Sequence, residues 1–214
     1  MTAATQARGP GRPAGGSADK TREQILAAAL EVFARDGLAG SSMRDIARRA
    51  RLRVSTLYHY VRSKDALYRA VQEHVQGRVR ALVMAELAHA PDLAAATRRV
   101  VGKVFDLFLE NRAFLQLGHR AMLEGAKRPA SSPSVAERWL GVVESTLAPA
   151  EARGEVKAID PVHLMVTVDA LVHWHILSDA VYRELLGRGL EDPEIAARTR
   201  EHVVRVALRT LGLD

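Results

Sequence analysis

Apolar residues recur at helical spacing as soon as the Gly- and Pro-rich beginning of the chain ends. The first stripe has the four-residue spacing of one helix face and consists of Ile25, Ala29 and Phe33. Thr21 followed three residues later by Gln24 fits a capping box, so this helix is expected to begin at Thr21. Gly37 stands where a left-handed residue that ends a helix belongs. Residues 1–20 have no periodicity and are expected to form a flexible N-terminal arm.

The next two apolar stripes predict two short helices joined by a tight connection. Ser42 can cap a helix over 43–50, whose buried side would be Met43, Ile46, Ala47 and Ala50. The stretch VSTLYHYVRSKDAL, residues 54–67, is rich in residues that favour strands. A lone strand between helices is unstable, however, and the helical spacing of Val54, Leu57 and Val61 predicts a third helix. Ser63 then caps a long fourth helix.

The remaining pattern predicts helices throughout. They are expected from Asp92 to about Glu110 and, in approximate bounds, over 113–125, 135–151, 161–186 and 193–211. The last two begin at Asp160-Pro161 and Asp192-Pro193, each an Asp N-cap followed by Pro in the first helical turn. The predicted class is therefore all-α, with about nine helices. It divides into a helix-turn-helix domain over 21–66 and a helical domain over 67–214.

Charge changes the picture because it is unevenly distributed. Residues 1–83 hold 15 Lys and Arg against 7 Asp and Glu, a net charge of +8, whereas the rest of the chain has a net charge of −2. Such asymmetry indicates a segment that binds a polyanion, although a solvated basic face would have the same composition. The absence of cysteine excludes disulfides and thiolate metal sites. With no apolar run near the length of a membrane span and no secretory signal, a cytoplasmic location is expected.

The basic segment has the chemistry of a DNA-binding helix-turn-helix. Five arginines precede or begin the third helix: Arg44, Arg48, Arg49, Arg51 and Arg53. Arginine can neutralise phosphates or contact guanine through two hydrogen bonds. With Leu57 and Val61 in the core, the residues left to face outward are Val54, Ser55, Thr56, Tyr58, His59 and Tyr60. Tyr58 and Tyr60 could instead be half-buried packing aromatics with a solvated hydroxyl. Arg12, between two prolines in the arm, could contact a minor groove or belong to a disordered tail.

The residues from Ser42 to Lys64 resemble the DNA-binding segment of TetR-family transcriptional repressors. The matching stretches are Met43-Arg44-Asp45-Ile46-Ala47, then Thr56-Leu57-Tyr58-His59-Tyr60, then Ser63-Lys64. The strong resemblance covers about residues 21–70. It implies that Arg44 contacts a base or phosphate, and that Val54, Ser55, Thr56 and Tyr58 face the groove. It further implies that His59, Tyr60 and Lys64 hold backbone phosphates.

Two residues of the turn depart from the family pattern. Arg51 replaces the usual glycine, although arginine tolerates a left-handed backbone poorly. Arg53 replaces the usual serine cap of the third helix and cannot accept hydrogen bonds from its first amides. We therefore expect a strained or differently shaped turn that nevertheless brings two additional cations near phosphate.

The helices over 161–186 and 193–211 are expected to form a homodimer. The segment LMVTVDALVHWHIL, residues 164–177, is apolar nearly all round, so one side can serve the core and another a partner. The last helix carries a stripe of Ile195, Thr199, His202, Val203 and Val206. The family resemblance also implies that these helices form a four-helix dimer interface. The alternative is that both stripes belong to the core of a monomeric bundle.

The resemblance implies a small-molecule pocket in the second domain. The effector is expected to be largely apolar or aromatic. Candidate lining residues are Phe105, Phe108, Phe114, His119, Met122 and Trp139, although each taken alone fits ordinary core better than a ligand contact. Asp169 and His173 share a helix face and could orient a polar group of the ligand or form a self-satisfied pair at the dimer interface. No cofactor and no metal site are expected.

The sequence as a whole predicts a ligand-responsive DNA-binding regulator. The favoured interpretation is a repressor that its ligand releases from a pseudo-palindromic operator. The alternative is an effector-independent or architectural DNA-binding protein. An enzyme is not expected, because the sequence has no cysteine nucleophile, glycine-rich phosphate loop or hydrolase motif.

Overall fold

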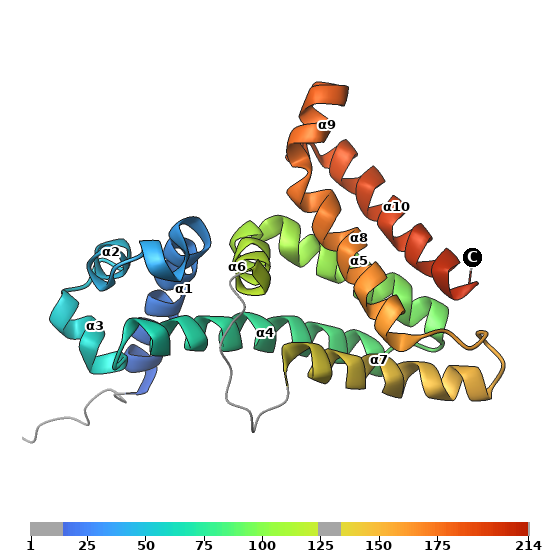
Figure 1. The fold of residues 1–214 in the computed structure, drawn as a ribbon, viewed down its shortest axis with the longest axis horizontal. Helices are drawn as coiled ribbons and strands as arrows, with labels where there is room; N and C mark the ends of the chain where they lie inside the picture. Colours follow the sequence, from blue (N-terminus) through green and yellow to red (C-terminus); the bar gives the residue numbers. More distant parts are fainter. Residues whose placement is uncertain (1–14, 124–133, 214) are drawn as a thin grey trace, which may run out of the picture. The chain divides into compact units, whose positions relative to one another are not determined.

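The computed structural model describes residues 15–123 and 134–213, and these are helical with short connections and no strand (Figure 1). Side chains are described from Ala18 onward, except those of Met122 and Leu123. The chain divides into two compact units that meet in the sequence between Val71 and Gln72. The predicted all-α class is confirmed, and each unit is considered by itself below.

The first unit is a small helical module with its own core. It contains α1 (Gly15–Gly40), α2 (Met43–Arg49), α3 (Val54–Tyr60) and the beginning of α4 (Lys64–Ala88). One apolar side chain from each helix is completely or almost completely buried: Phe33, Ile46, Leu57 and Leu67. The edge of one ring meets the face of the other between Phe33 and Tyr68, with the ring centroids 5.0 Å apart. This shared core fixes α3 against α1, α2 and α4.

The first helix begins earlier than the capping pattern predicted. It starts at Gly15, so Thr21 lies inside α1 and is not its N-cap, and residues 15–20 are not part of a flexible arm. Ala18 and Lys20 are good helix formers, which explains why the helix extends past the apolar stripe. The expected break at Gly37 is present, because that residue has φ 71° and ψ 177° within α1. Residues 1–14, including Arg12, lie outside the described residues.

The second unit contains the rest of α4 and six further helices. They are α5 (Leu93–Glu110), α6 (Arg112–Leu123), α7 (Val135–Ala152), α8 (Pro161–Leu177), α9 (Asp179–Leu186) and α10 (Pro193–Leu211). The side chains of Asp92, Ser134, Asp160 and Asp192 all accept hydrogen bonds from first-turn amides, which explains why these helix starts were predictable. The helix predicted over 113–125 begins at Arg112 and is described as far as Leu123, and residues 124 and 125 lie outside the described residues.

Helix α5 is central to the second unit, since it packs against α10, α8, α7 and α6. One close approach between α5 and α10 occurs at Gly102, where an added Cβ would clash with the guanidinium of Arg200. That guanidinium crosses the glycine and pairs with Asp106 at 3.0 Å. At one end of the unit a compact apolar cluster joins four helices and one loop through Leu93, Leu147, Val156, Leu164 and Leu211.

The long helix predicted over 161–186 is two helices. The break is at Ser178 (φ −86°, ψ 22°), and the axes of α8 and α9 differ by 55°. The described residues therefore form ten helices, where about nine were expected. Among them, no single helix has the length and apolarity needed to cross a membrane. The bent pair α8–α9 meets that standard by length and composition alone.

Candidate nucleic-acid interface and effector pocket

Helix α2 is anchored by its cap and its apolar face. Ser42 Oγ accepts a hydrogen bond from the Asp45 amide at 3.1 Å and donates one to the Asp45 carboxylate at 2.5 Å. The bond from Ser42 is the main reason that the pKa of Asp45 lies below its usual value. Met43, Ile46, Ala47 and Ala50 are buried as predicted. The opposite side of the helix, which carries Arg44, is exposed.

The turn between α2 and α3 keeps a left-handed residue although that residue is arginine. Arg51 has φ 54°, the only positive φ of a non-glycine residue in the described chain. The Leu52 amide donates to the Ala47 carbonyl at 2.9 Å, and the Arg51 amide donates to the Arg48 carbonyl at 3.1 Å. This pair of bonds is a Schellman motif, which normally has glycine at the left-handed position. The arginine therefore leaves the turn's shape intact but makes its backbone conformation less favourable.

Helix α3 buries one side and exposes the other. Leu57 is completely buried, whereas Ser55, Tyr58 and His59 are exposed, with Tyr58 at 52%. Three more predicted DNA contacts are half-buried: Val54, Thr56 and Tyr60. The helix starts without a side-chain cap from Arg53, as expected from the departure at that position.

The prediction for Val61 is wrong in detail. It does not lie on the helical face with Leu57, because α3 ends at Tyr60 and Val61 has extended backbone angles, φ −139° and ψ 136°. Its side chain is half-buried. Leu57 is thus the main apolar anchor of α3.

The cations of this module fall into two groups. Arg48 pairs with Asp45, Arg49 pairs with Glu31, and Lys64 Nζ donates to the Ser41 carbonyl at 2.8 Å. Among the described residues from Met43 to Lys64, four exposed arginines have no such partner: Arg44, Arg51, Arg53 and Arg62. These four flank or precede α3 and leave their donors available to phosphate.

In the second unit, the structure brings together part of the predicted ligand set. The His173 ring lies 5.0 Å from the ring of Phe108, centroid to centroid, and its Nδ1 is 2.9 Å from the Asp169 carboxylate. The Asp169 residue is exposed to solvent, whereas Phe105 is completely buried. The Asp–His pair is therefore formed, and Phe105 has the burial of a core residue.

The other predicted ligand residues lie elsewhere. Trp139 Nε1 donates to Gln76 Oε1 at 3.0 Å, which ties α7 to α4. His119 on α6 is exposed. Phe114 is buried beneath the guanidinium of Arg78, which lies 5.1 Å from the ring centroid. The side chain of Met122 lies outside the described residues.

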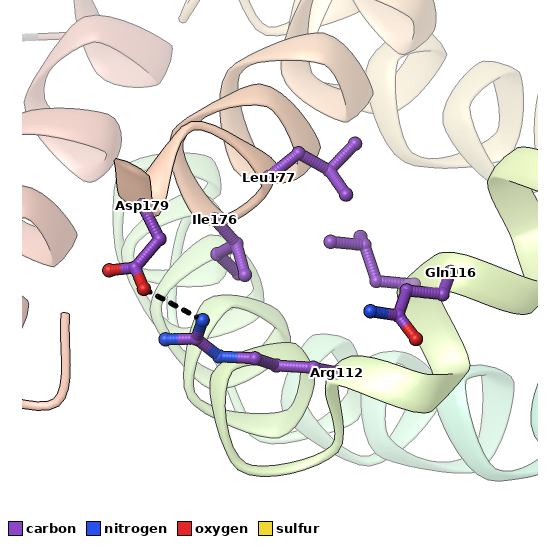
Figure 2. A pocket seen from close by; sticks show the side chains of 6 residues that line it. Arg112, Gln116, Ile176, Leu177 and Asp179 are labelled. Carbon is purple, nitrogen blue, oxygen red and sulfur yellow. Dashed lines mark hydrogen bonds and ion pairs between the residues drawn. The ribbon is translucent and has the colours of Figure 1, made fainter. Parts of the chain in front are cut away.

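A small cavity lies between α6 and the junction of α8 with α9, and sequence reasoning did not find it. Its volume is about 90 Å³, and it is lined by Arg112, Leu115, Gln116, Ile176, Leu177 and Asp179 (Figure 2). Arg112 Nη1 donates to Asp179 Oδ2 at 3.0 Å across one side of it. The two residues are 67 positions apart in the sequence, so no local pattern relates them.

Two family models match the chain, one for each unit. Residues 25–71 match "Bacterial regulatory proteins, tetR family", and residues 94–206 match "Tetracyclin repressor-like, C-terminal domain". The chain belongs to the TetR family. It is accordingly a TetR-family transcriptional regulator with an N-terminal helix-turn-helix and a C-terminal helical domain.

Two curated relatives are named as regulators of opposite sign. The transcriptional repressor NicS of Pseudomonas putida is 24% identical over 201 residues, which is 91% of this chain and 93% of NicS. The transcriptional activator FasR of Mycolicibacterium smegmatis is 37% identical over 125 residues, 55% of each chain. Both names are those of regulators and not of enzymes.

A solved structure supports the same TetR-type fold over nearly the whole chain. The Streptomyces coelicolor protein SCO4942 has a TM-score of 0.65 and 26% sequence identity, covering 91% of this chain and 99% of that one. The left-handed backbone at Arg51 and the cavity at the α8–α9 junction are observed in the structure of this chain itself.

Proposed function

We propose that this regulator binds a pseudo-palindromic operator as a homodimer, with α3 in the major groove, and that a small molecule bound in its second unit releases it. The observation that supports recognition of DNA by α3 is that one face of this helix is buried and the other is exposed. Leu57 is fully buried, while Ser55, Tyr58 and His59 project polar groups to solvent from seven residues of helix. A recognition helix needs this arrangement, because one side must be held by the module while the other meets base edges.

The proposed contacts divide by chemistry. Base edges and thymine methyl groups are assigned to Val54, Ser55, Thr56 and Tyr58. Phosphate contacts are assigned to Arg44, Arg53, His59, Tyr60 and Lys64. The exposed and unpartnered state of Arg44 and Arg53 supports their assignment. Lys64 has a second role, since its bond to the Ser41 carbonyl ties the start of α4 to the segment between α1 and α2.

The homodimer is proposed to form through α8 and α9, with a contribution from α10. Large apolar side chains are exposed at helical spacing along α8 and α9: Val162, Val166, Trp174, Leu177, Val181 and Leu185. We call this set the apolar stripe. Its exposed area in a single chain favours a partner, because soluble proteins rarely leave such a stripe in water. The stripe predicted on α10 is largely used within the chain, since Ile195, Thr199 and Val203 are buried. The exposed face of α10, around His202, would then meet the partner.

Residues 67–214 are proposed to be the effector-binding and dimerisation domain, residues 21–66 the DNA-binding domain, and the cytoplasm the place of action. An apolar or aromatic effector was expected from Phe105 and Phe108, yet both are buried as core residues. That burial favours the second candidate function, an effector-independent DNA-binding protein. The two are separated by whether any compound changes operator affinity, because release requires a ligand that binds one conformation better than the other.

Footprinting on the DNA that flanks this protein's own gene tests the proposal. We expect two protected half-sites separated by about one or more helical turns, of ~10 base pairs each. Repeating the footprint with small acids and with aromatic compounds should identify a class that removes the protection. Protection that no compound alters would support the effector-independent function. Uniform weak binding without a footprint would contradict operator recognition.

A further inference from the structure

The junction between α8 and α9 is held by one buried carboxylate. Asp179, the first residue of α9, is only 7% exposed. Its Oδ1 accepts the Leu190 amide at 2.5 Å, and its Oδ2 accepts Arg183 Nη2 at 2.8 Å and Arg112 Nη1 at 3.0 Å. A single side chain therefore connects α6, α9 and the loop that precedes α10.

The backbone at Gly189 lies so close to this carboxylate that no side chain fits there. A Cβ added at Gly189 would lie 2.6 Å from Asp179 Oδ1 and 2.9 Å from Arg183 Nε, so even a methyl group would displace the pairing. Both oxygens of Asp179 are already used by donors of the protein. Asp179 is consequently a structural group and offers little to a ligand.

Arg112 is in the opposite situation. A guanidinium has five N–H donors, and in the described part of the chain Arg112 gives only one of them to a protein acceptor. Its side chain is 38% exposed and borders the cavity, to which Gln116 adds an amide from the next turn of α6 (Figure 2). The remaining walls are apolar, from Leu115, Ile176 and Leu177. Unused donors beside an apolar wall suit an anion that carries a short hydrocarbon tail.

The size of the cavity restricts the tail. Its volume of about 90 Å³ is well below the roughly 300 Å³ at which sites for drug-sized ligands begin. The enclosed part of the cavity therefore matches an acid with a few carbon atoms.

We infer that this cavity binds a short-chain carboxylate, with the carboxylate on the free edge of Arg112 and Gln116 and the alkyl group against Leu115, Ile176 and Leu177. The inference rests on the proposed function, because it names an effector class and the place where it acts. The negative charge of the bound carboxylate repels Asp179 across the guanidinium that both contact, and so weakens the tie between α6 and the α8–α9 junction. Leu177 and Val181 flank that junction and belong to the apolar stripe, so the ligand alters the dimer surface.

Calorimetric titration of the full-length protein without DNA tests binding directly, with sodium butyrate as the probe and butyramide as its uncharged analogue at equal ionic strength. We expect saturable butyrate binding and at least tenfold weaker butyramide binding. Arg112→Gln should weaken butyrate binding at least tenfold, and Gln116→Leu should weaken it severalfold without changing the helical circular dichroism spectrum. Ala197→Gln, an exposed change on α10, is the control and should bind butyrate normally.

Equal affinity for butyrate and butyramide would overturn the inference, and so would the absence of saturable butyrate binding. The inference would also fail if neither Gln116→Leu nor Arg112→Gln changed the affinity for butyrate. A separate arm measures operator affinity with and without butyrate. Operator binding that is intact but unaffected by bound butyrate would refute the effector role alone. Loss of all operator binding in the untreated protein would instead refute the proposed DNA-binding function.

Discussion

At the scale of single residues, Arg51 shows a conflict between backbone conformation and charge. Its φ of 54° places a long side chain where glycine is normally found, and neither an ion pair nor a side-chain hydrogen bond within the described chain compensates for this. Arg51→Gly should therefore raise the free energy of unfolding by about 0.5–1 kcal/mol. Thermal unfolding followed by circular dichroism measures the change.

Arg62→Gly is the matched control, because Arg62 is an exposed arginine of the same unit, outside the helices, whose φ is not positive. It should not stabilise the protein, since glycine there only adds freedom to the unfolded chain. A destabilised Arg51→Gly protein would contradict the conformational argument.

Asp179 is the residue with the most pronounced shift in acidity. Burial would raise its pKa, but the Leu190 amide and the guanidiniums of Arg183 and Arg112 outweigh burial and hold the pKa at about 2, below the ordinary 3.8. A carboxylate with a depressed pKa stabilises the fold above its unfolded pKa and loses that effect as pH falls toward its folded pKa. Asp179→Asn should cost about 2 kcal/mol at pH 6, and the difference from the unchanged protein should shrink between pH 4 and pH 2.

Chemical denaturation followed by tryptophan fluorescence measures this difference, since both tryptophans, Trp139 and Trp174, lie in the second unit. Asp106→Asn is the control, because the pair of Asp106 with Arg200 is about 40% exposed on each side and should contribute less than about 1 kcal/mol. A difference for Asp179→Asn that stays constant down to pH 2 would refute the assigned role of its charge.

At the scale of helices, the bent pair α8–α9 presents the apolar stripe. Trp174 is 68% exposed, an unusual position for a tryptophan. If the stripe is the dimer surface, Trp174→Asp should leave the monomer folded and shift sedimentation from dimer to monomer at micromolar concentration, because a charge would be buried without a partner.

Met84→Asp is the control for this helix, since Met84 is also an exposed apolar residue, at 46%, but lies on α4 away from the stripe. It should sediment as the unchanged protein does. Monomeric behaviour of the unchanged protein at micromolar concentration would contradict the proposed homodimer.

The helices also show what the sequence could and could not predict. The start of α10 was predictable because Asp192 caps it locally and Pro193 follows. The break at Ser178 was not, because residues 164–177 are apolar on all sides and neither Gly nor Pro marks the end of α8. The break coincides with Asp179, whose partners come from α6 and from the loop before α10. Such long-range contacts leave no periodic pattern in the sequence.

The candidate sites were predictable to different degrees for the same reason. Helix α3 is a continuous stretch, so its buried Leu57 and exposed Tyr58 follow from helical spacing and context. The cavity is assembled from α6 and the α8–α9 junction, and none of its six lining residues was in the predicted ligand set. Apolar and aromatic residues such as Phe105 were chosen as ligand contacts by residue type. A buried core residue and a pocket-lining residue have the same sequence pattern, so the sequence could not separate them.

At the scale of the whole molecule, α3 is proposed to recognise the base sequence of the operator. The cations around α3 are proposed to provide affinity for DNA of any sequence. The charge asymmetry of the chain and the four exposed arginines without an ion-pair partner between Met43 and Lys64 support the second part. Electrostatic binding alone is strongly salt-dependent and does not distinguish sequences. The two contributions can therefore be separated by comparing operator with random DNA.

The most direct test is fluorescence anisotropy of operator and random duplexes, over a range of salt concentrations, with Tyr58→Ala and Arg53→Gln. We predict that Tyr58→Ala weakens operator binding about tenfold and leaves random DNA nearly unaffected, since one base contact contributes ~1–3 kcal/mol. Arg53→Gln should weaken both duplexes alike and reduce the salt slope by about 1. Equal losses on operator and random DNA for both variants would contradict the claim that α3 reads the operator.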